Sequence, residues 1–193
     1  MSRLILASQS PRRKELLKTI VSDFECIPAK GDEVFHSGPI DEAQRDVALA
    51  KAREVFQAHP ESIVLAADTI VVDGSRILQK PKSKAEAFET LRSLSGRSHE
   101  VKTAVVLMEE KQTISTVETT VVHFRNLSDK EIQAYVEQGT CLDKAGSYGI
   151  QDVDFVDGID GSYTNVVGLP VELVRNWLES RSLADVPQTN AQA

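Results

Sequence analysis

Cysteine, histidine and aromatic residues are scarce in this 193-residue chain, and their scarcity excludes several kinds of site. Cys26 and Cys141 lie far apart without a Cys-x-x-Cys spacing, so we expect neither a zinc site nor a disulfide framework. The four histidines stand singly and show no metal-ligand spacing. The sequence also lacks a catalytic-looking Ser-His or Cys-His pair and a Walker-type Gly-x-x-x-x-Gly-Lys-Ser motif, which argues against a P-loop enzyme.

Long hydrophobic runs, secretion signals and lipidation motifs are missing as well, so we expect a cytoplasmic protein without a membrane partner. The net charge of −7 argues against nucleic acid as a partner, and any bound anion must meet a local basic cluster. With 41% hydrophobic and 26% charged residues, the composition is that of a globular domain. We expect a single domain over residues 1–183 and a flexible tail over residues 184–193.

The segment after the first apolar run breaks a local rule. Residues 4–7 read as a strand, Ser10 as a helix cap and Pro11 as the first helical position. Three cations at positions 12–14 then crowd the positive end of that helix, where acidic residues are favoured. A bound phosphate would explain them, because backbone donors and guanidinium groups would converge on it. A solvated surface turn is the alternative reading.

Asp68 is set between two apolar runs, at residues 63–67 and 70–72. An unpaired carboxylate is costly to bury there, so donors, a metal or a cation should hold it. We favour a functional role over a carboxylate that caps a backbone turn, because Lys80 follows shortly after the hairpin. Lys51 lies at the edge of a helical apolar stripe, where a snorkelling surface lysine is the commoner case.

Helices and strands interleave along the chain, which predicts an α/β domain with a mixed sheet. Capping-box patterns of an Asp or Ser with Gln or Glu three residues later predict three helices, which begin at Asp41, Ser83 and Ser128. A last helix should follow Gly168. Beyond those already named, we expect strands at residues 24–27, 101–108, 113–124 and 162–167.

Several polar residues are conspicuous in the sequence because their neighbours are apolar or glycine-rich. They are Arg12, Arg13, Glu33, Lys51, Asp68, Lys80, Lys144 and Gln151. Cations together with two carboxylates suit a polyphosphate bound with a hard divalent cation. From the residues alone we therefore predict a phosphate-handling α/β enzyme.

A set of sequence blocks resembles the Maf family. The blocks are LASQSPRRKELL at 6–17, AADT at 66–69, KP at 80–81, LSGRSH at 94–99, TAV at 103–105, DKAGSYGIQ at 143–151 and VGLP at 167–170. They occur in the family's order and spacing, and the resemblance covers residues 4 to about 178. The resemblance implies a fold like that of inosine triphosphate pyrophosphatases, an elongated mixed sheet with flanking helices and a central cleft between two lobes.

The resemblance also implies a nucleoside triphosphate pyrophosphatase, which cleaves between the α- and β-phosphates and prevents incorporation of unwanted nucleotides. Asp68 falls on the family's proposed proton acceptor. Ser8, Arg13, Lys51 and Lys80 match positions expected around the phosphates or at the cleft. Glu33, together with Asp68, would hold a divalent cation, for which oxygen ligands favour Mg²⁺ or Mn²⁺.

Family subgroups differ at three positions that fall on Arg12, Thr69 and Gln151. This combination is similar to the subgroup that acts on dTTP and UTP, whereas the 7-methyl-GTP subgroup carries Trp, Gln and Glu. A glutamine amide can donate to O4 and accept from N3–H of uracil or thymine, which gives the resemblance a physical reason. One departure is the acidic segment at residues 152–154, which could ligate metal or repel phosphate.

Two other functions are compatible with the sequence. Family members were first linked to inhibition of septum formation, so a regulator that binds nucleotide or a division partner is the main alternative. A kinase or phosphotransferase is less well supported, because no acceptor site is legible. Family members are often dimers, and a homodimer is one assembly that the resemblance allows.

Overall fold

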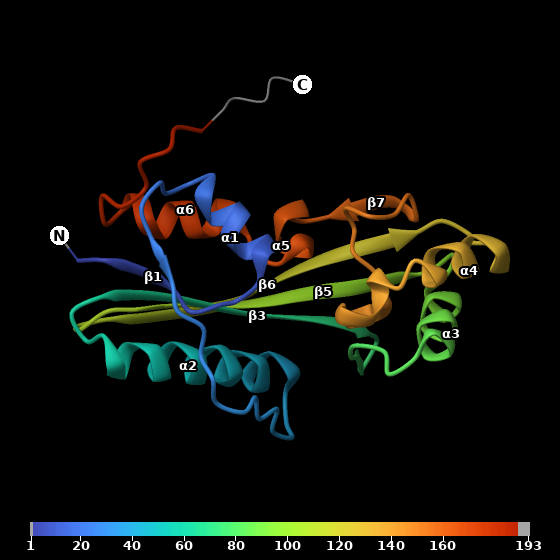
Figure 1. Ribbon diagram of the computed structural model, residues 1–193, viewed down its shortest axis with the longest axis horizontal. Helices are drawn as coiled ribbons and strands as arrows, with labels where there is room; N and C mark the ends of the chain where they lie inside the picture. The colour runs from blue at the N-terminus through green and yellow to red at the C-terminus, as the bar shows by residue number, and fades with distance from the viewer. Residues whose placement is uncertain (1, 189–193) are drawn as a thin grey trace. The chain divides into compact units, whose positions relative to one another are not determined.

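The computed structural model describes residues 2–188 (Figure 1). The chain forms two compact units. Unit 1 comprises Met1–Asp68, Ala104–Glu118 and Gly168–Ala193, and unit 2 comprises Thr69–Thr103 and Thr119–Val167. The predicted catalytic residue Asp68 therefore ends a segment of unit 1. The predicted specificity residue Thr69 begins a segment of unit 2.

The described residues form one seven-stranded mixed sheet. Its strands are β1 (Leu4–Leu6), β2 (Glu25–Cys26), β3 (Ile63–Asp73), β4 (Arg76–Leu78), β5 (Ser98–Met108), β6 (Thr113–Phe124) and β7 (Val156–Asp160). The strand order is β2-β1-β3-β5-β6-β7, and β4 also pairs with β3. β1 is parallel to β2 and β3, whereas β4 on β3 and β7 on β6 are antiparallel. This mixed sheet, with helices beside it, confirms the predicted α/β class.

In unit 1, alternate residues of the strands face two separate hydrophobic layers. Helices α1 (Pro11–Lys18) and α6 (Val171–Glu179) pack on the layer that contains Leu4, Leu6 and Leu65. Helix α2 (Ile40–Ala58) packs on the layer that contains Ile5, Val64 and Ala66. In Figure 1, α2 lies on one side of β1 and α1 and α6 lie on the other. The unbroken apolar run of residues 63–67 is thus a strand covered on both faces, as predicted.

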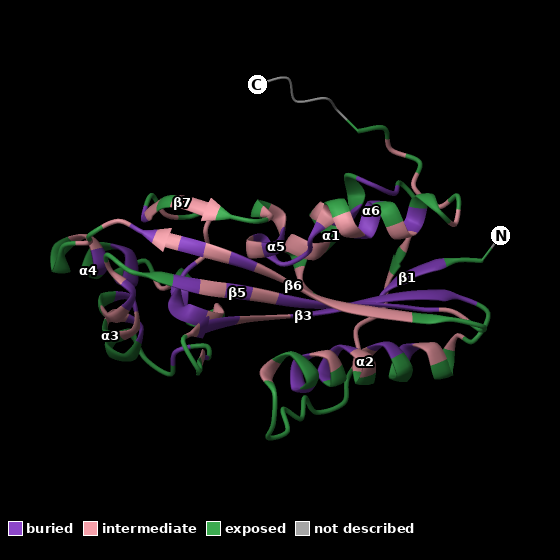
Figure 2. Ribbon diagram, turned by 180° about the vertical axis from the view of Figure 1, so that it is seen from behind, coloured by how far each residue is buried: buried purple, intermediate pink, exposed green. Residues whose placement is uncertain are grey.

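In unit 2, helices α3 (Lys84–Leu94) and α4 (Asp129–Glu137) pack against the strands around Val71, Val101 and Val122. Ser128 and Glu131 form the predicted capping box. Ser83 caps α3 through the N–H of Glu86. Figure 2 shows the buried stripe of each helix turned inward and its exposed residues turned outward.

Two local predictions are wrong. Residues 162–167, predicted as a strand, contain helix α5 (Tyr163–Val167). The β-branched side chains favour a strand, but the Oγ of Ser162 accepts a hydrogen bond from the N–H of Asn165 and so caps a helical turn. Strand β7, just before it, was not predicted. The predicted capping box at Asp41 is also absent, because α2 begins at Ile40 without a side-chain cap and the amide of Gln44 is used elsewhere.

The predicted tail begins with residues that are tied to unit 1. The N–H groups of Asp185 and Val186 both donate to the carbonyl of Ile20, and Arg175 donates to the carbonyl of Val186. Residues 189–193 of that tail lie outside the described residues, and the flexible-tail boundary stays a prediction. Between residues 2 and 188, none of the helices has the length and apolar content needed to cross a membrane.

Candidate active site

The start of α1 holds one cation rigidly. Ser10 caps the helix through the N–H of Arg13, and Pro11 takes the first helical position, as predicted. The guanidinium of Arg13 is fixed at two points, because Nε donates to the carbonyl of Gly168 at 2.8 Å and Nη1 donates to the Oγ of Ser8 at 3.4 Å. No acidic residue occupies the first turn of this helix. The helix therefore presents a positioned guanidinium at its positive end, which favours an anion.

The VGLP block supplies the backbone that receives Arg13. Gly168 has a φ of +140°, a conformation that residues with side chains rarely adopt. Its carbonyl accepts the Arg13 hydrogen bond, and Leu169 behind it is fully buried. The glycine of this block thus accepts a hydrogen bond from α1, although the two segments are far apart in the sequence.

Asp68 is buried and held by a cation, as the sequence predicted. It is 7% exposed, and its Oδ1 lies 3.1 Å from the Nζ of Lys51. The same ammonium lies 2.7 Å from Oε1 of Glu33, so one cation joins two carboxylates. The Lys51 side chain is only 17% exposed, which rules out the snorkelling alternative. Ion pairs of this kind are strengthened by their partial exclusion from water.

Arg13 is coupled electrostatically to the same carboxylates. Burial lowers the pKa of its guanidinium, and the charges of Asp68 and Glu33 oppose this effect. The neighbouring charge of Arg12 lowers the pKa further. The structure therefore brings Ser8, Arg13, Glu33, Lys51 and Asp68 together in unit 1. We call these five residues the charged set.

Gln44 positions the backbone at Asp68 and was not assigned this role from the sequence. Its side chain is fully buried, and Nε2 donates to the carbonyl of Asp68 at 2.7 Å. A signal was available, because Gln44 lies on the same helical stripe as Ala48, Ala52 and Val55. A glutamine on an apolar stripe needs a buried hydrogen-bond partner.

Thr69 is held by a chain of neutral hydrogen bonds in unit 2. Its Oγ1 lies 2.8 Å from the Oγ1 of Thr103, which in turn donates to the carbonyl of Asn165. Asn165 and Thr103 are both fully buried. Asn165 is fixed further through Nδ2, which donates to Thr120 at 2.9 Å. A threonine pair on adjacent strands therefore sets the position of the predicted specificity residue.

The DKAGSYGIQ block forms a tightly folded loop in unit 2. Gly146 has a φ of +72°, and a Cβ there would lie 3.0 Å from Val71. Its N–H donates to the carbonyl of Gln79, so this loop contacts the segment that carries Lys80. Ser147 has a φ of +67° although it is not glycine, and its buried Oγ has no hydrogen-bond partner among the described residues. The loop therefore stores backbone strain.

The carboxylates of the acidic segment at residues 152–154, which departs from the family pattern, form local ion pairs. Asp152 lies 3.7 Å from the Nζ of Lys144, and Asp154 lies 2.8 Å from Arg125. Arg125 also binds Glu131 at 2.8 Å and lowers the pKa of that carboxyl to about 2. Both additional carboxylates thus have a cation as neighbour within unit 2.

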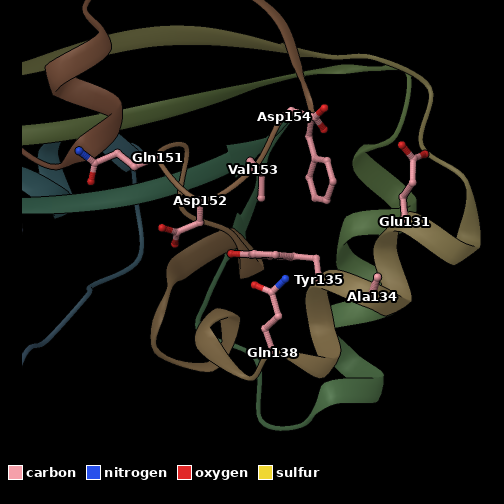
Figure 3. A pocket seen from close by; sticks show the side chains of 9 residues that line it. Glu131, Ala134, Tyr135, Gln138, Gln151, Asp152, Val153 and Asp154 are labelled. Carbon is pink, nitrogen blue, oxygen red and sulfur yellow. The ribbon is translucent and has the colours of Figure 1, made fainter.

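A pocket of about 540 Å³ lies between α4 and residues 151–155 (Figure 3). Tyr135, Val153 and Phe155 supply its apolar wall, and Gln138 and Asp152 supply polar groups. Gln151 also lines the pocket and is exposed, but its amide extends away from Tyr135 and Gln138 in Figure 3. The amide of Gln151 is therefore set apart from the polar groups of Tyr135 and Gln138.

Three further predicted site residues are not members of the charged set. Arg12 is half-buried at the start of α1, and Lys80 and Gln151 are exposed in unit 2. Across residues 2–188, no three His, Cys, Asp or Glu side chains are grouped as a ready metal site. Glu33 and Asp68 are two carboxylates around one ammonium, which is fewer protein ligands than such a group requires.

Comparison with known proteins gives concordant results. The family Maf, described as Maf-like protein, matches residues 3–181. The dTTP/UTP pyrophosphatase of Bacillus cytotoxicus is 49% identical over 180 residues, which cover 91% of this chain and 94% of that protein. The dTTP/UTP pyrophosphatase of Syntrophomonas wolfei is 45% identical and covers 91% of this chain and 96% of its own length.

A solved structure shares the fold. The Staphylococcus aureus Ham1 protein aligns with a TM-score of 0.56 and 16% identity, covering 93% of this chain and all of that one. At this identity the likeness concerns the fold alone, and it agrees with the expected inosine triphosphate pyrophosphatase-like architecture. Since the family match spans nearly the whole chain and relatives approach half identity, the chain belongs to the Maf family.

Proposed function

We propose that this protein is a nucleoside triphosphate pyrophosphatase that hydrolyses dTTP and UTP to the nucleoside monophosphate and pyrophosphate. The observation that carries the proposal is the ammonium of Lys51 between the carboxylates of Glu33 and Asp68, with Arg13 coupled to both. Two carboxylates beside positioned cations suit hydrolysis of a phosphoanhydride. The relatives are named dTTP/UTP pyrophosphatases, and this name supplies the nucleotide class of the proposal.

Asp68 is the proposed general base. Its carboxylate takes a proton from a water molecule, whose oxygen forms a bond to the α-phosphorus. The bond from the α-phosphorus to the bridging oxygen breaks, and pyrophosphate leaves with its electron pair. Gln44 fixes the backbone carbonyl of Asp68, so the carboxylate starts from a defined position.

Arg13, Lys51, Lys80 and Ser8 are the proposed phosphate ligands. In phosphoryl transfer, positioning and electrostatic stabilisation account for most of the catalysis, and fixed cations supply both. Arg13 is the best positioned, because Ser8 and Gly168 hold its guanidinium. Lys80, which is exposed, would reach the phosphates only when the nucleotide is bound.

Glu33 and Asp68 would hold the divalent cation. Their oxygens already converge on one positive charge, and Mg²⁺ is commonly bound through one or two carboxylates together with substrate phosphates and water. The donor set therefore fits Mg²⁺ or Mn²⁺ better than a softer metal. When bound, such an ion would neutralise the charge on the phosphate oxygens.

Arg12, Thr69 and Gln151 are the proposed specificity residues. Thr69 is short and fixed by Thr103, which leaves room for the methyl group of thymine. The amide of Gln151 can pair with O4 and N3–H of a uracil or thymine ring. We further propose that the protein acts on free nucleotides in the cytoplasm as a single domain, and that it removes unwanted pyrimidine nucleotides.

The test is pyrophosphate release by the purified protein with Mg²⁺ or Mn²⁺, using UTP, dTTP, CTP, GTP and 7-methyl-GTP. Asp68→Asn runs alongside as the inactive variant. Turnover of UTP and dTTP that is lost in the variant supports both the reaction and the pyrimidine preference. A preference for another nucleotide overturns the specificity assignment. Binding without turnover overturns the enzyme and favours a nucleotide-binding regulator of septum formation.

A further inference from the structure

The imidazole of His99 is buried in the hydrophobic core of unit 2. It is 2% exposed and packs edge-on against Phe124 and Tyr148, with ring centroids 4.8 and 5.5 Å apart. Its Nε2 lies 2.6 Å from the hydroxyl of Tyr148, whereas Nδ1 has no hydrogen-bond partner among the described residues. Among the described residues, the Tyr148 hydroxyl is therefore the hydrogen-bond partner of the buried imidazole.

The hydrogen bond joins two neutral groups. Burial lowers the pKa of His99 to about 4 and raises the pKa of Tyr148. The ring is consequently uncharged at neutral pH, and the bond depends on direction and distance rather than on charge. Tyr148 is itself only 5% exposed, so water does not replace the bond readily.

Tyr148 belongs to the strained loop that ends at Gln151. Ser147, directly before it, has a φ of +67° although it is not a glycine. Such a conformation persists only where surrounding contacts impose it. Two hydrogen bonds follow Ser147 in the loop, one between Tyr148 and His99 and one from the N–H of Gly149 to the hydroxyl of Tyr135. These bonds fix the backbone two and three residues before Gln151.

Packed aromatic rings connect Tyr148 with Tyr135, the two tyrosines whose hydrogen bonds hold this loop. Phe124 contacts Tyr148 at 4.9 Å and Phe155 at 5.9 Å, and Phe155 contacts Tyr135 at 5.5 Å. A shift of Tyr148 would thus displace the packed rings that line the pocket beside Gln151.

We propose that His99 is a positioning residue for nucleotide selection, which acts through Tyr148 to hold the loop that carries Gln151. This inference rests on the proposed function, because it assigns a determinant to the specificity residue named there. The competing explanation is that His99 contributes to stability alone. If His99 is a positioning residue, loss of the hydrogen bond should raise KM even where the stability of the fold is kept. If His99 contributes to stability alone, KM should change only when the stability changes.

Three variants separate these explanations: Tyr148→Phe, His99→Phe and the double variant. Each single variant leaves one buried polar group without its partner, so the melting temperature should fall. The double variant replaces both partners by apolar rings, so the melting temperature should recover much of the loss. The hydrogen bond is missing in all three. We therefore expect the KM for UTP to rise about tenfold in each, with kcat changed by less than about twofold.

Tyr163→Phe is the matched control, because its exposed ring also loses one hydroxyl in unit 2. It should leave KM and melting temperature unchanged. Recovery of both melting temperature and KM in the double variant would overturn the inference, as would an unchanged KM in Tyr148→Phe. Should the double variant not fold, Tyr148→Phe decides alone through its KM and kcat below its melting temperature.

Gln151→Glu distinguishes failure of this inference from failure of the proposed function. If Gln151→Glu does not change the ratio of UTP to 7-methyl-GTP turnover, the specificity assignment fails, and the inference fails with it. If Gln151→Glu changes that ratio while the His99 and Tyr148 variants leave the KM for UTP unchanged, only the inference fails.

Discussion

The two compact units hold their candidate site residues by different means. In unit 1, Glu33, Lys51 and Asp68 are joined by ion pairs of 2.7 and 3.1 Å. In unit 2, Thr69 and the loop before Gln151 are held by hydrogen bonds between neutral groups of 2.8 and 2.6 Å. Charge provides strong but weakly directional forces, whereas neutral hydrogen bonds fix direction. The contrast suits chemistry on a polyphosphate in the first case and recognition of a base in the second.

The comparison implies different consequences of substitution. Removing Lys51 or Asp68 leaves a charge without its counterpart and changes the reacting groups themselves. Removing one member of a neutral hydrogen-bond chain shifts the geometry of a group that reads the substrate. Changes at Lys51 and Asp68 should therefore act on kcat, and changes in the hydrogen bonds that hold Thr69 and the loop before Gln151 should act on KM and on the choice of nucleotide.

Asp68→Asn should have the largest effect. An amide cannot accept the proton, so kcat for UTP should fall by about 10³-fold while nucleotide affinity changes little. Steady-state pyrophosphate release and direct nucleotide binding measure the two quantities. Asp157→Asn, an exposed residue of β7, is the matched control and should retain wild-type kcat. A variant at Asp68 with more than a tenth of the wild-type kcat would contradict the assignment.

Lys51→Met should have the next largest effect. The methionine keeps most of the length of the side chain but removes the ammonium and leaves Glu33 and Asp68 to repel one another, so kcat/KM for UTP should fall about 10²-fold. Lys111→Met, in the exposed turn between β5 and β6, is the control for loss of a positive charge. Similar kinetics in both variants would show that Lys51 does not act on the substrate.

The neutral His99 predicts a loss of stability in acid. Its native pKa of about 4 lies below the ordinary value of 6.5, because burial outweighs the opposing effect of Asp73. The unfolded chain therefore binds the proton more readily, so this stability is present above pH 6.5 and is lost as the pH falls toward 4. Arg97 and His123 lower the pKa further.

Between pH 7.5 and pH 5, the wild type should lose about 2 kcal/mol of unfolding free energy more than His99→Phe does. Urea unfolding of both proteins at the two pH values measures this difference, in which the contributions of other titrating groups cancel. An equal loss in both proteins would mean that His99 is protonated at little cost in the native state.

Asp154→Asn should have the smallest effect. Its side chain is 91% exposed, and exposed ion pairs contribute little to stability. The melting temperature should change by no more than about 2 °C, and the KM for UTP should stay at the wild-type value. A lower KM would instead indicate that this carboxylate repels the bound nucleotide, as the sequence alone had left open.

Much of the fold follows from hydrophobic pattern and caps. The buried run at residues 63–67 and the caps at Ser10 and Ser128 are where the sequence predicts them. Residues 162–167 could not be assigned correctly, because β-branched propensity favours a strand whereas a serine cap and buried asparagine contacts stabilise a helix. Tertiary contacts of this kind are invisible in a local pattern.

The candidate site shows the same division. Asp68 was recognisable because an isolated carboxylate in an apolar run needs a counter-charge, and Lys51 supplies it. Gln44 was assigned to a helix cap, since its partner, the carbonyl of Asp68, lies 24 residues away in the sequence. His99 gave no signal beyond its place in a family block, because Tyr148 is 49 residues away.

The most direct test of the account compares Asp68→Asn and Gln151→Glu with UTP and 7-methyl-GTP in one series of kcat and KM measurements. We expect Asp68→Asn to lower kcat for every nucleotide that is turned over and to leave their order unchanged. We expect Gln151→Glu to reverse or narrow the preference for UTP while kcat for the preferred nucleotide stays within a few-fold of the wild type. Loss of kcat in both variants without a change of preference would contradict the separation of chemistry from selection.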